Sequence, residues 1–420
     1  MDDSSLASAR ERDAADPLSD CRERFFLPDG VYMDGNSLGL LSEDAEAALD
    51  SVVKEWRDLA IRGWTDADPD WFTYGERLGD RVAPLVGAGG EEVVIANSTT
   101  VNIHTLFGTF YDPARGEKVV VDALDFPTDH YAIRAQLRAR GVDPDEALRV
   151  VESRDGRTVA REDVVDAIDD DVGLVFLPSV LYRSGQLFGI EAITEAAHES
   201  GALAGFDLAH SVGVVPHHLS DAGVDFAVWC HYKYLNAGPG AIAGLYVNER
   251  HFGVTPALAG WWGNDKGTQF EMSMTYQPAQ SAGAFQIGTI PVLAAAPLDG
   301  ALDVLADAGG VEAAREKSLA LTDYLIDLVD ERLPDCEVGT PRAHAERGGH
   351  VAVEHPEAAR VSEALRDRGV VVDYRPPNVV RVCPAPLYTR FEDVWRVVDE
   401  IRTVLDERAY ESYSMGGGVT

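Results

Sequence analysis

The chain has 420 residues, of which 45% are hydrophobic, so it is long enough to form more than one domain and to fold without disulfides or a structural metal. Acidic residues outnumber basic ones by 71 to 36, and the formal charge of −35 excludes nucleic acid and anionic membranes as expected partners. Only five of the basic residues are lysines, a composition typical of proteins from salt-loving cells, although an ordinary acidic protein is the alternative.

The cysteines and the hydropathy pattern bear on the cellular setting. Cys21, Cys230, Cys336 and Cys383 are spaced neither as a metal site nor as a redox pair. The first residues lack a signal-peptide pattern, and no run of 18 apolar residues predicts a transmembrane helix. We therefore expect a reduced, cytoplasmic protein without a metal.

The first 290 residues predict a large α/β unit preceded by an arm. Residues 1–30 are polar and suit an arm with a short helix, and residues 42–63 have helical spacing, with Ser42 near the helix start. From about residue 90, short apolar strands alternate with helices. The expected strands are 93–96, 118–121, 172–177, 202–207, 225–230 and 243–247, and the expected helices are 100–110, 129–140 and 191–199. This alternation predicts a largely parallel sheet covered on both faces, which binds ligands at the carboxyl ends of its strands.

The pattern changes after residue 290 and predicts a smaller α+β domain. The expected helices are 292–305, 311–332, 357–368 and 391–408, and the expected strands lie near 351–353, 370–374 and 379–383. We therefore expect an arm at 1–45 that packs with the small domain, a large domain at 46–290, a small C-terminal domain at 291–412 and a disordered tail at 413–420.

Lys233 differs from the other lysines in its surroundings. Lys54, Lys118, Lys266 and Lys317 lie in polar or charged segments and are expected to be exposed. Lys233 follows an apolar strand in H-Y-K-Y-L-N-A-G-P-G, where aromatic residues crowd the amine and glycines allow close approach. Taken alone, a lysine that binds a cofactor and a lysine that snorkels at a strand end are equally good interpretations.

Asp207 decides between these interpretations. It ends a strand in G-F-D-L-A-H, at the expected ligand-binding edge of the sheet. A strand-end aspartate followed by a strand-end lysine is the arrangement that pyridoxal phosphate uses on this fold, because the carboxylate keeps the pyridine nitrogen protonated. A helix N-cap is the alternative for this aspartate considered by itself.

Two further segments suit the same cofactor. N-S-T-T-V-N at 97–102 opens a helix, and its hydroxyls and free backbone N–H groups suit a phosphate. Phe126, in F-P-T-D-H-Y, could stack on a pyridine ring. Plain helix capping and plain core packing are the alternatives for these segments.

Six motifs occur in the order in which kynureninases carry them. They are D-G-N-S-L-G at 34–39, F-P-T-D-H-Y at 126–131, G-F-D-L-A-H at 205–210, Y-K-Y-L-N-A-G-P-G at 232–240, G-W-W-G at 260–263 and R-V-C-P-A-P-L-Y at 381–388. The chain therefore resembles the kynureninase family over about residues 25–405. The resemblance implies the aspartate-aminotransferase fold (fold type I), pyridoxal 5′-phosphate as the cofactor, a homodimer with its active site at the interface, and hydrolysis of L-kynurenine to anthranilate and L-alanine.

The resemblance also implies roles for individual residues. Lys233 carries the cofactor as a Schiff base and acts as the catalytic base, Tyr232 contacts the cofactor and is the candidate proton donor, and Arg381 clamps the substrate α-carboxylate. The other implied cofactor contacts are Thr99, Thr100, Phe126, Asp129, Asp207 and His210, with Trp261 and Thr289 supplied by the neighbouring subunit. The other implied substrate contacts are Ser37, Trp64 and Gly288.

Comparison with the family pattern shows one departure from it and predicts a substrate preference. Many relatives carry a small hydroxyl residue where this chain has Pro178, so that contact is lost or shifts to Ser179. Trp64, Gly288 and Thr289 resemble the bacterial form of the ring pocket, whereas the form that prefers 3-hydroxykynurenine tends to carry His, Ser and Asn. We therefore expect a preference for kynurenine.

Two rival functions remain open. One is another class V enzyme, such as an aminotransferase or a cysteine desulfurase, and the other is a regulator that binds the cofactor without catalysis. A desulfurase needs a nucleophilic cysteine, but Cys336 lies among acids that raise a thiol pKa. A regulator usually carries a basic DNA-binding segment, which this sequence lacks. Anthranilate as a product would feed tryptophan breakdown through the kynurenine pathway, or another route.

Overall fold

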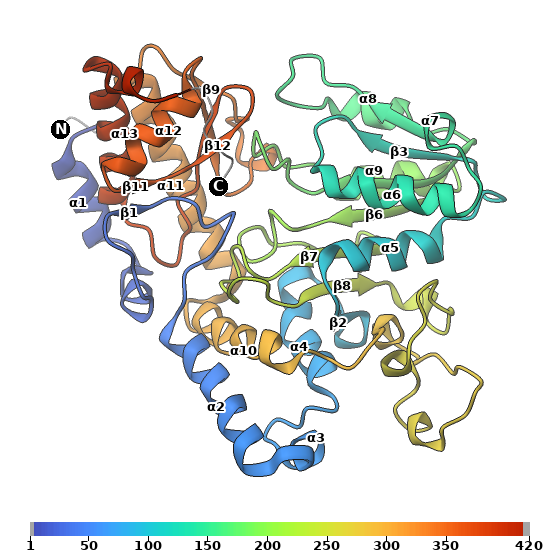
Figure 1. Cartoon of the computed structure of the whole chain (residues 1–420). Coiled ribbons are helices and arrows are strands. Elements are labelled where there is room, and N and C mark those ends of the chain that lie inside the picture. Colours follow the sequence, from blue (N-terminus) through green and yellow to red (C-terminus); the bar gives the residue numbers. More distant parts are fainter. Residues whose placement is uncertain (1–3, 415–420) are drawn as a thin grey trace.

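A seven-stranded sheet forms the centre of the larger part of the chain in the computed structural model, which describes residues 4–414 (Figure 1). Its strand order is β2-β8-β7-β6-β5-β3-β4. The strands are β2 (Val93–Ile95), β3 (Lys118–Asp122), β4 (Leu148–Val151), β5 (Val172–Pro178), β6 (Leu203–Asp207), β7 (Phe226–Cys230) and β8 (Ala243–Val247). Only the two pairings that involve β8 are antiparallel among these described strands, which confirms the predicted mainly parallel sheet.

Helices cover both faces of this sheet. Alternate residues of a strand point to opposite faces, so a strand that is apolar throughout needs packing partners on both sides. In β3, Val119 and Val121 belong to one apolar cluster and Val120 to the other. The first face carries α5 (Thr99–Phe110) and α6 (Pro127–Ala139). The second face carries α4 (Tyr74–Val82), α9 (Ile190–Glu199) and α10 (Val292–Asp307). Packing on both faces explains why the strands are continuous apolar runs rather than alternating ones.

A second, antiparallel sheet forms the smaller part, with strand order β12-β13-β10-β9. The strands are β9 (Glu337–Val338), β10 (Val351–Glu354), β12 (Asp373–Arg375) and β13 (Val379–Val382). The helices are α11 (Gly310–Arg332), α12 (Ala358–Asp367) and α13 (Phe391–Asp406), and they share a separate apolar cluster with these strands. The expected α+β character of the C-terminal part is therefore confirmed.

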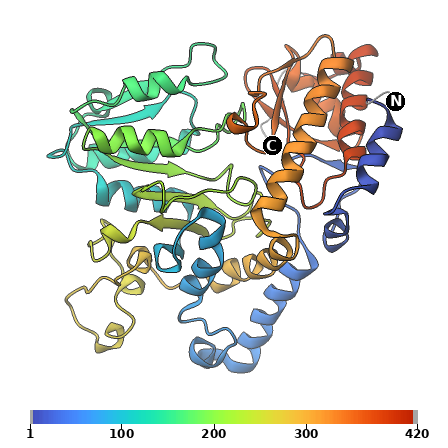
Figure 2. The same cartoon turned by 180° about the vertical axis from the view of Figure 1, so that it is seen from behind.

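The N-terminal arm lies against this smaller part (Figure 2). α1 (Leu6–Ala14) packs beside α13, and the Asp13 carboxylate accepts hydrogen bonds from the first backbone N–H groups of that helix, at Phe391 and Glu392. β1 (Val31–Tyr32) pairs in parallel with β11 (Val370–Val371). The domain bounds given above stay predictions, and residues 415–420 of the expected tail lie outside the described residues.

The arm corrects the prediction for Lys317. Its ammonium is buried and pairs with Asp16 at 2.6 Å, so it is not an exposed helix lysine. The sequence of α11 alone cannot show this, because the covering carboxylate comes from a segment about three hundred residues away.

α2 (Glu43–Leu59) begins as predicted, with Ser42 Oγ accepting a hydrogen bond from the backbone N–H of Ala45. Trp56, on the expected apolar side of this helix, is nevertheless 59% exposed. The sequence pattern did not predict β4, α4 or the short helices α3 (Gly63–Asp66), α7 (Pro144–Ala147) and α8 (Arg161–Asp166). No helix within residues 4–414 is long and apolar enough to cross a bilayer.

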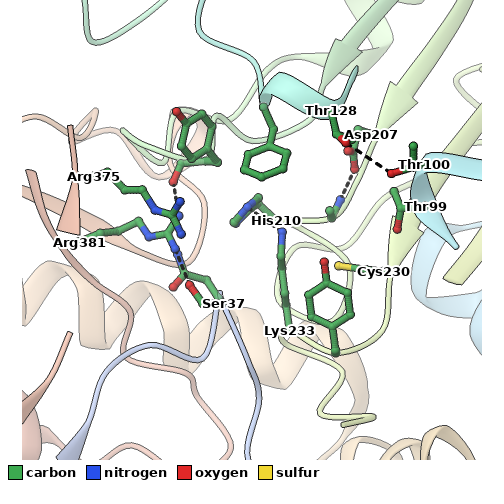
Figure 3. Close-up of a pocket in the computed structure, with 15 residues that line it drawn as sticks. Ser37, Thr99, Thr100, Thr128, Asp207, His210, Cys230, Lys233, Arg375 and Arg381 are labelled. Carbon is green, nitrogen blue, oxygen red and sulfur yellow. Dashed lines mark hydrogen bonds between the residues drawn. The ribbon is translucent and has the colours of Figure 1, made fainter. Parts of the chain in front are cut away.

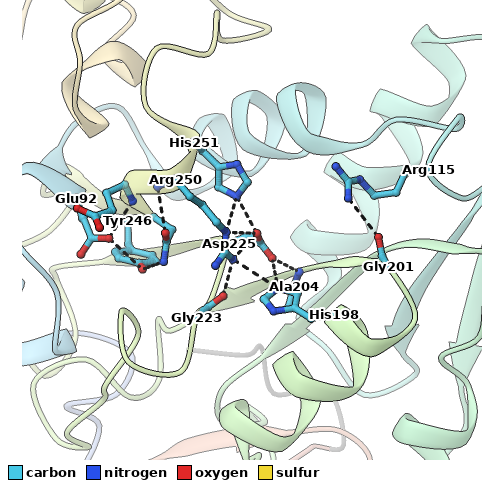
Figure 4. A network of polar contacts seen from close by, with 12 residues as sticks. Glu92, Arg115, His198, Gly201, Ala204, Gly223, Asp225, Tyr246, Arg250 and His251 are labelled. Carbon is cyan, nitrogen blue, oxygen red and sulfur yellow. Dashed lines mark hydrogen bonds and ion pairs between the residues drawn. The ribbon is translucent and has the colours of Figure 1, made fainter.

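Asp225 fixes the sheet at the edge where the parallel strands begin (Figure 4). It precedes β7, is fully buried, and accepts hydrogen bonds from His198 at 2.9 Å, His251 at 2.7 Å and Arg250 at 2.6 Å. Burial raises the pKa of this carboxyl, but the hydrogen bonds, with that of His251 the largest, lower it to about 2. The network ties α9 and the segment after β8 to the sheet, away from the ligand-binding edge.

Candidate active site

A cavity of about 260 Å³ lies at the carboxyl ends of the parallel strands, where the smaller part of the chain closes over the sheet (Figure 3). Parallel sheets bind ligands at this edge. The lining comes from the arm, from strand ends and the loops after them, from the first turns of α5 and α6, and from β12 and β13. It consists of Asn36, Ser37, Thr99, Thr100, Phe126, Thr128, Tyr182, Asp207, Ala209, His210, Cys230, Tyr232, Lys233, Arg375 and Arg381.

The Lys233 amine lies in this cavity, in the loop that follows β7. Its Nζ is 2.8 Å from Nε2 of His210, and it lies 5.9 Å from the ring centre of Tyr232. Burial lowers the pKa of His210 well below its usual value, with the Lys233 charge contributing, so the imidazole is neutral. A neutral imidazole nitrogen accepts the hydrogen bond that the amine donates, which orients Lys233 without a carboxylate partner.

Asp207 ends β6 and is backed by two further buried carboxyls. Burial raises the pKa of Asp207 while the Lys233 charge lowers it. Burial raises the pKa of Asp129 well above its usual value, and the charges of Asp125 and Asp207 raise it further. If Asp129 and Asp207 were both ionised, neither could donate a hydrogen bond to the other. Because the raised pKa of Asp129 keeps a proton on it, Asp129 donates a hydrogen bond to Asp207. Asp207 is then the anion at the cavity wall, and Asp129 lies behind it.

The start of α5 offers unused hydrogen-bond donors to the cavity. Thr99 and Thr100 occupy the first turn, and Ser98 makes no side-chain cap to the helix. Thr100 Oγ1 lies 3.4 Å from Thr128 Oγ1, and Thr128 was not among the predicted site residues. Free N–H groups and hydroxyls at the N-terminus of a helix form a site for an anion.

Aromatic rings line part of the cavity. Phe126 is 43% exposed, and its ring makes an edge contact with Tyr182 at 5.4 Å between centroids. An exposed phenyl face of this kind is free to stack on a planar ligand. The Tyr232 phenol lines the same cavity, and its pKa is raised by neighbouring Cys230 and by burial, so it keeps its proton at neutral pH.

Arg381, from β13, is fully buried at the end of the cavity nearest the arm. Its Nη1 donates to the Tyr182 carbonyl at 2.7 Å, and its Nη2 donates to Ser37 Oγ at 2.7 Å. The same Nη2 pairs with Asp373 at 2.5 Å. The expected substrate contacts Arg381 and Ser37 therefore lie side by side.

The structure places four expected site residues away from the cavity of their own chain. Trp64 and Thr289 line a second, apolar cavity of about 410 Å³ together with Trp56 and Trp71. Gly288 is exposed, and the Trp261 ring is 47% exposed. None of the four lines the cavity that holds Lys233. The resemblance assigned Trp261 and Thr289 to a neighbouring subunit, and that assignment stays a prediction.

Pro178 and Ser179 also lie outside the lining. Pro178 ends β5 opposite Asp207 in the sheet register. The Ser179 hydroxyl is buried and lies 2.6 Å from Ser211 Oγ. The loss of the hydroxyl contact at position 178, or its shift to Ser179, stays a prediction.

Lys266 also differs from the prediction, because it is half-buried rather than exposed. Its Nζ lies 4.3 Å from the Trp262 ring centre and 4.7 Å from that of Phe72, and it pairs with Glu76 at 3.6 Å. Burial lowers the pKa of this half-buried lysine. Cation–π contacts of this kind cannot be seen in the polar loop sequence G-N-D-K-G.

Comparisons with known proteins place the chain in a family. A family model described as the kynureninase C-terminal domain matches residues 314–401. Kynureninases from Geobacillus thermodenitrificans and Bacillus cereus are both 48% identical, over 413 and 410 residues, covering 97% and 96% of this chain and 96% and 95% of their own. The chain belongs to the kynureninase family. As a member of it, the protein is a pyridoxal phosphate-dependent hydrolase of a carbon–carbon bond, as the sequence motifs implied.

Solved structures share the fold of this chain. A mutant of C-DES with glycine covalently linked to its pyridoxal phosphate cofactor has a TM-score of 0.80 at 18% identity, covering 91% of this chain and 98% of its own. The apo cysteine desulfurase from Thermococcus onnurineus NA1 has a TM-score of 0.76 at 20% identity, covering 96% of this chain and 98% of its own. At these identities the likeness shows the fold alone, and it confirms the fold type I prediction.

The cavity fits the cofactor of the kynureninases. It brings together an amine, a buried carboxylate backed by a protonated one, a free aromatic face and an uncapped helix start. Each of these matches one part of pyridoxal phosphate: the aldehyde, the pyridine nitrogen, the ring and the phosphate.

Proposed function

We propose that this kynureninase hydrolyses L-kynurenine to anthranilate and L-alanine, with pyridoxal 5′-phosphate held by Lys233 and Asp207. The observation that carries the proposal is the presence of Lys233, Asp207 and Arg381 in one cavity. Thr99, Thr100, Phe126 and His210 lie around the same space and are proposed as further cofactor contacts, with Asp129 acting from behind Asp207.

The proposed roles follow from the positions of the groups. Bound pyridoxal phosphate supplies an electron sink for the charge that develops next to the substrate amine. Arg381, with Ser37, holds the substrate α-carboxylate, because a guanidinium matches a carboxylate in shape and charge. Lys233 Nζ removes the α-proton, and the neutral His210 beside it keeps that amine oriented.

Tyr232 is the proposed proton donor when alanine forms. Its phenol lines the cavity next to Lys233 and stays protonated at neutral pH, because Cys230 and burial raise its pKa. An acid in this place supplies the proton that the β-carbon needs after the carbon–carbon bond has broken.

We propose a homodimer whose second subunit completes each site. Large apolar side chains are exposed on one chain, among them Trp56, Phe270, Met272 and Met274, and a second copy would bury them. Trp261 and Thr289 would reach the partner's phosphate site from this surface, and Trp64 and Gly288 would border the aromatic ring of the partner's substrate. The bulky Trp64 gives an added ring hydroxyl little polar help, so kynurenine is the proposed preferred substrate over 3-hydroxykynurenine.

A desulfurase is the alternative with a specific residue to examine. Cys336 lies outside the cavity, and burial together with Asp335 raises its pKa to about 12, so it is a poor nucleophile. The composition supports a salt-adapted protein, and a cytoplasmic location and a place in tryptophan catabolism complete the proposal.

The proposal is tested by incubating purified protein at high salt, with pyridoxal phosphate, with L-kynurenine, L-cysteine or an amino acid and keto acid pair. Fluorescent anthranilate from kynurenine supports it. If the protein makes no anthranilate and instead releases sulfide from cysteine, or transaminates the amino acid and keto acid pair, another class V activity replaces the proposed one.

A further inference from the structure

A second arginine shares the active-site cavity with Arg381. Arg375 lies in β12, two residues from Asp373, and both side chains therefore lie on the same face of the strand. Asp373 stands opposite Arg381 in the β12–β13 register. The fully buried Asp373 carboxylate pairs with Arg375 Nε and with Arg381 Nη2, each at 2.5 Å. One carboxylate thus holds two guanidiniums, and Figure 3 shows those two arginines side by side at the cavity wall.

The two guanidiniums differ in the donors that they leave free. Both terminal nitrogens of Arg381 donate to protein groups, to Tyr182 and Ser37. Arg375 uses only Nε within the part of the chain that the structure describes, so its two terminal nitrogens have no protein acceptor there. Its Cζ lies 5.7 Å from the ring centre of Tyr182, which limits where the side chain can go. Unused N–H groups on a cation that lines a cavity are a binding site for an anion.

The reaction makes an anion that the substrate does not have. One carboxylate enters with kynurenine, on the α-carbon. Water oxygen bonds to the γ-carbon, the Cβ–Cγ bond breaks with its electron pair going to Cβ, and the γ-carbon leaves as the carboxylate of anthranilate. One water proton ends on Cβ, and the other is released. Two carboxylates are therefore present before the products leave, and Arg381 is already engaged on three sides.

We infer that Arg375 binds the carboxylate that the reaction creates, and that it stabilises the negative oxygen of the hydrated γ-carbonyl before the bond breaks. This inference rests on the proposed kynureninase activity. A charge that develops in the transition state gains most from a fixed donor already in place, and Asp373 fixes Arg375 in this way.

The test compares how two product-like ligands bind to the cofactor-loaded dimer. Anthranilate carries only the new carboxylate, and L-alanine carries only the α-carboxylate. Arg375→Gln is expected to weaken anthranilate binding by about tenfold or more and to lower kcat, while L-alanine binding changes by less than about twofold. Arg375→Lys is expected to recover part of the anthranilate affinity, because it restores the charge but not the planar fork. Equilibrium dialysis measures both ligands.

Arg183→Gln is the matched control. Arg183 is next to Tyr182 and contacts the Pro376 carbonyl at 3.5 Å, but it does not line the cavity, so its loss is expected to change neither affinity. Circular dichroism and cofactor absorbance equal to wild type establish that Arg375→Gln is folded and loaded.

Two results overturn the assignment in a working enzyme. If Arg375→Gln weakens L-alanine instead of anthranilate, Arg375 is the α-carboxylate clamp, and if it changes neither ligand, Arg375 binds no product. If the wild-type protein makes no anthranilate, the proposed kynureninase activity itself is wrong. That result is distinct from a failure of the Arg375 assignment, which is judged only in an active enzyme.

Discussion

Lys233 Nζ lies 2.8 Å from Nε2 of His210, so the amine that is proposed to carry the cofactor is held by a neutral imidazole. Asp207 stands at the neighbouring strand end, where it contributes charge to the same cavity. The pair explains how a partly exposed lysine can be oriented near a carboxylate without forming an ion pair that would occupy its amine.

Replacing Lys233 with alanine is expected to abolish turnover, because no other amine lines the described cavity. The visible absorbance of the bound cofactor should be lost as well. Lys118→Ala is the control, since that lysine does not line the cavity and its Nζ donates a hydrogen bond to the Glu146 carbonyl at 2.7 Å. A Lys233→Ala protein that retained both absorbance and turnover would remove Lys233 from the mechanism.

Mixed dimers test whether each site uses two chains. Lys233→Ala and Trp261→Ala homodimers are expected to be nearly inactive, whereas random reassociation of the two should restore about one quarter of the wild-type sites. One site of each mixed dimer then carries both changes and the other carries none. Lys233→Ala mixed with Arg381→Gln is the control and should not recover, because both residues line the cavity of one chain. Equal behaviour of the two mixtures would contradict the shared site.

The ring pocket predicts a preference among substrates. The kcat/KM for kynurenine is expected to exceed that for 3-hydroxykynurenine, because the Trp64 indole leaves an added hydroxyl without hydrogen-bond partners. Trp64→His should narrow or reverse the difference. Steady-state kinetics with both substrates measures this, and a clear wild-type preference for the hydroxylated substrate would show that Trp64 does not select in this way.

The Asp225 network predicts a pH-dependent contribution to stability. The pKa of Asp225 is about 2 in the folded chain and 3.8 in an unfolded one, so its charge stabilises the fold above about pH 4, and this contribution is lost as the pH falls towards 2. Asp225→Asn is expected to lower the free energy of unfolding by roughly 2 kcal/mol at neutral pH. Urea denaturation across this pH range measures the difference. A deficit that stayed constant down to pH 3 would show that lost packing, rather than charge, is responsible.

The fold was predictable where local patterns agree with the tertiary structure. Apolar strands alternating with helices defined the parallel sheet and the order of its strands along the chain. α4 was missed because it contains Gly75 and Gly79, which weaken a helix signal. The structure gives a reason for Gly79, since a side chain there would meet the Val93 carbonyl. The sheet order and the reversed direction of β8 are tertiary facts that no local pattern carries.

The site was predictable at its strand ends and less so elsewhere. Lys233, Asp207 and Thr99 each follow or end a strand, so a shared sheet edge brings them together. Tyr182 and Arg375 were missed because they enter from segments with no such rule. Asp373 and Arg375 are two residues apart on one strand, and Asp373 lies opposite Arg381 on the next. Because alternate residues of a strand share a face, this spacing was the sequence feature that could have predicted Arg375 beside Arg381.

The most direct test of the central claim is to measure both products from one reaction. The cofactor-loaded protein at high salt should convert L-kynurenine into equal amounts of anthranilate and L-alanine, and Lys233→Ala should produce neither. Loss of kynurenine without stoichiometric anthranilate, or equal product formation by Lys233→Ala, would contradict the account.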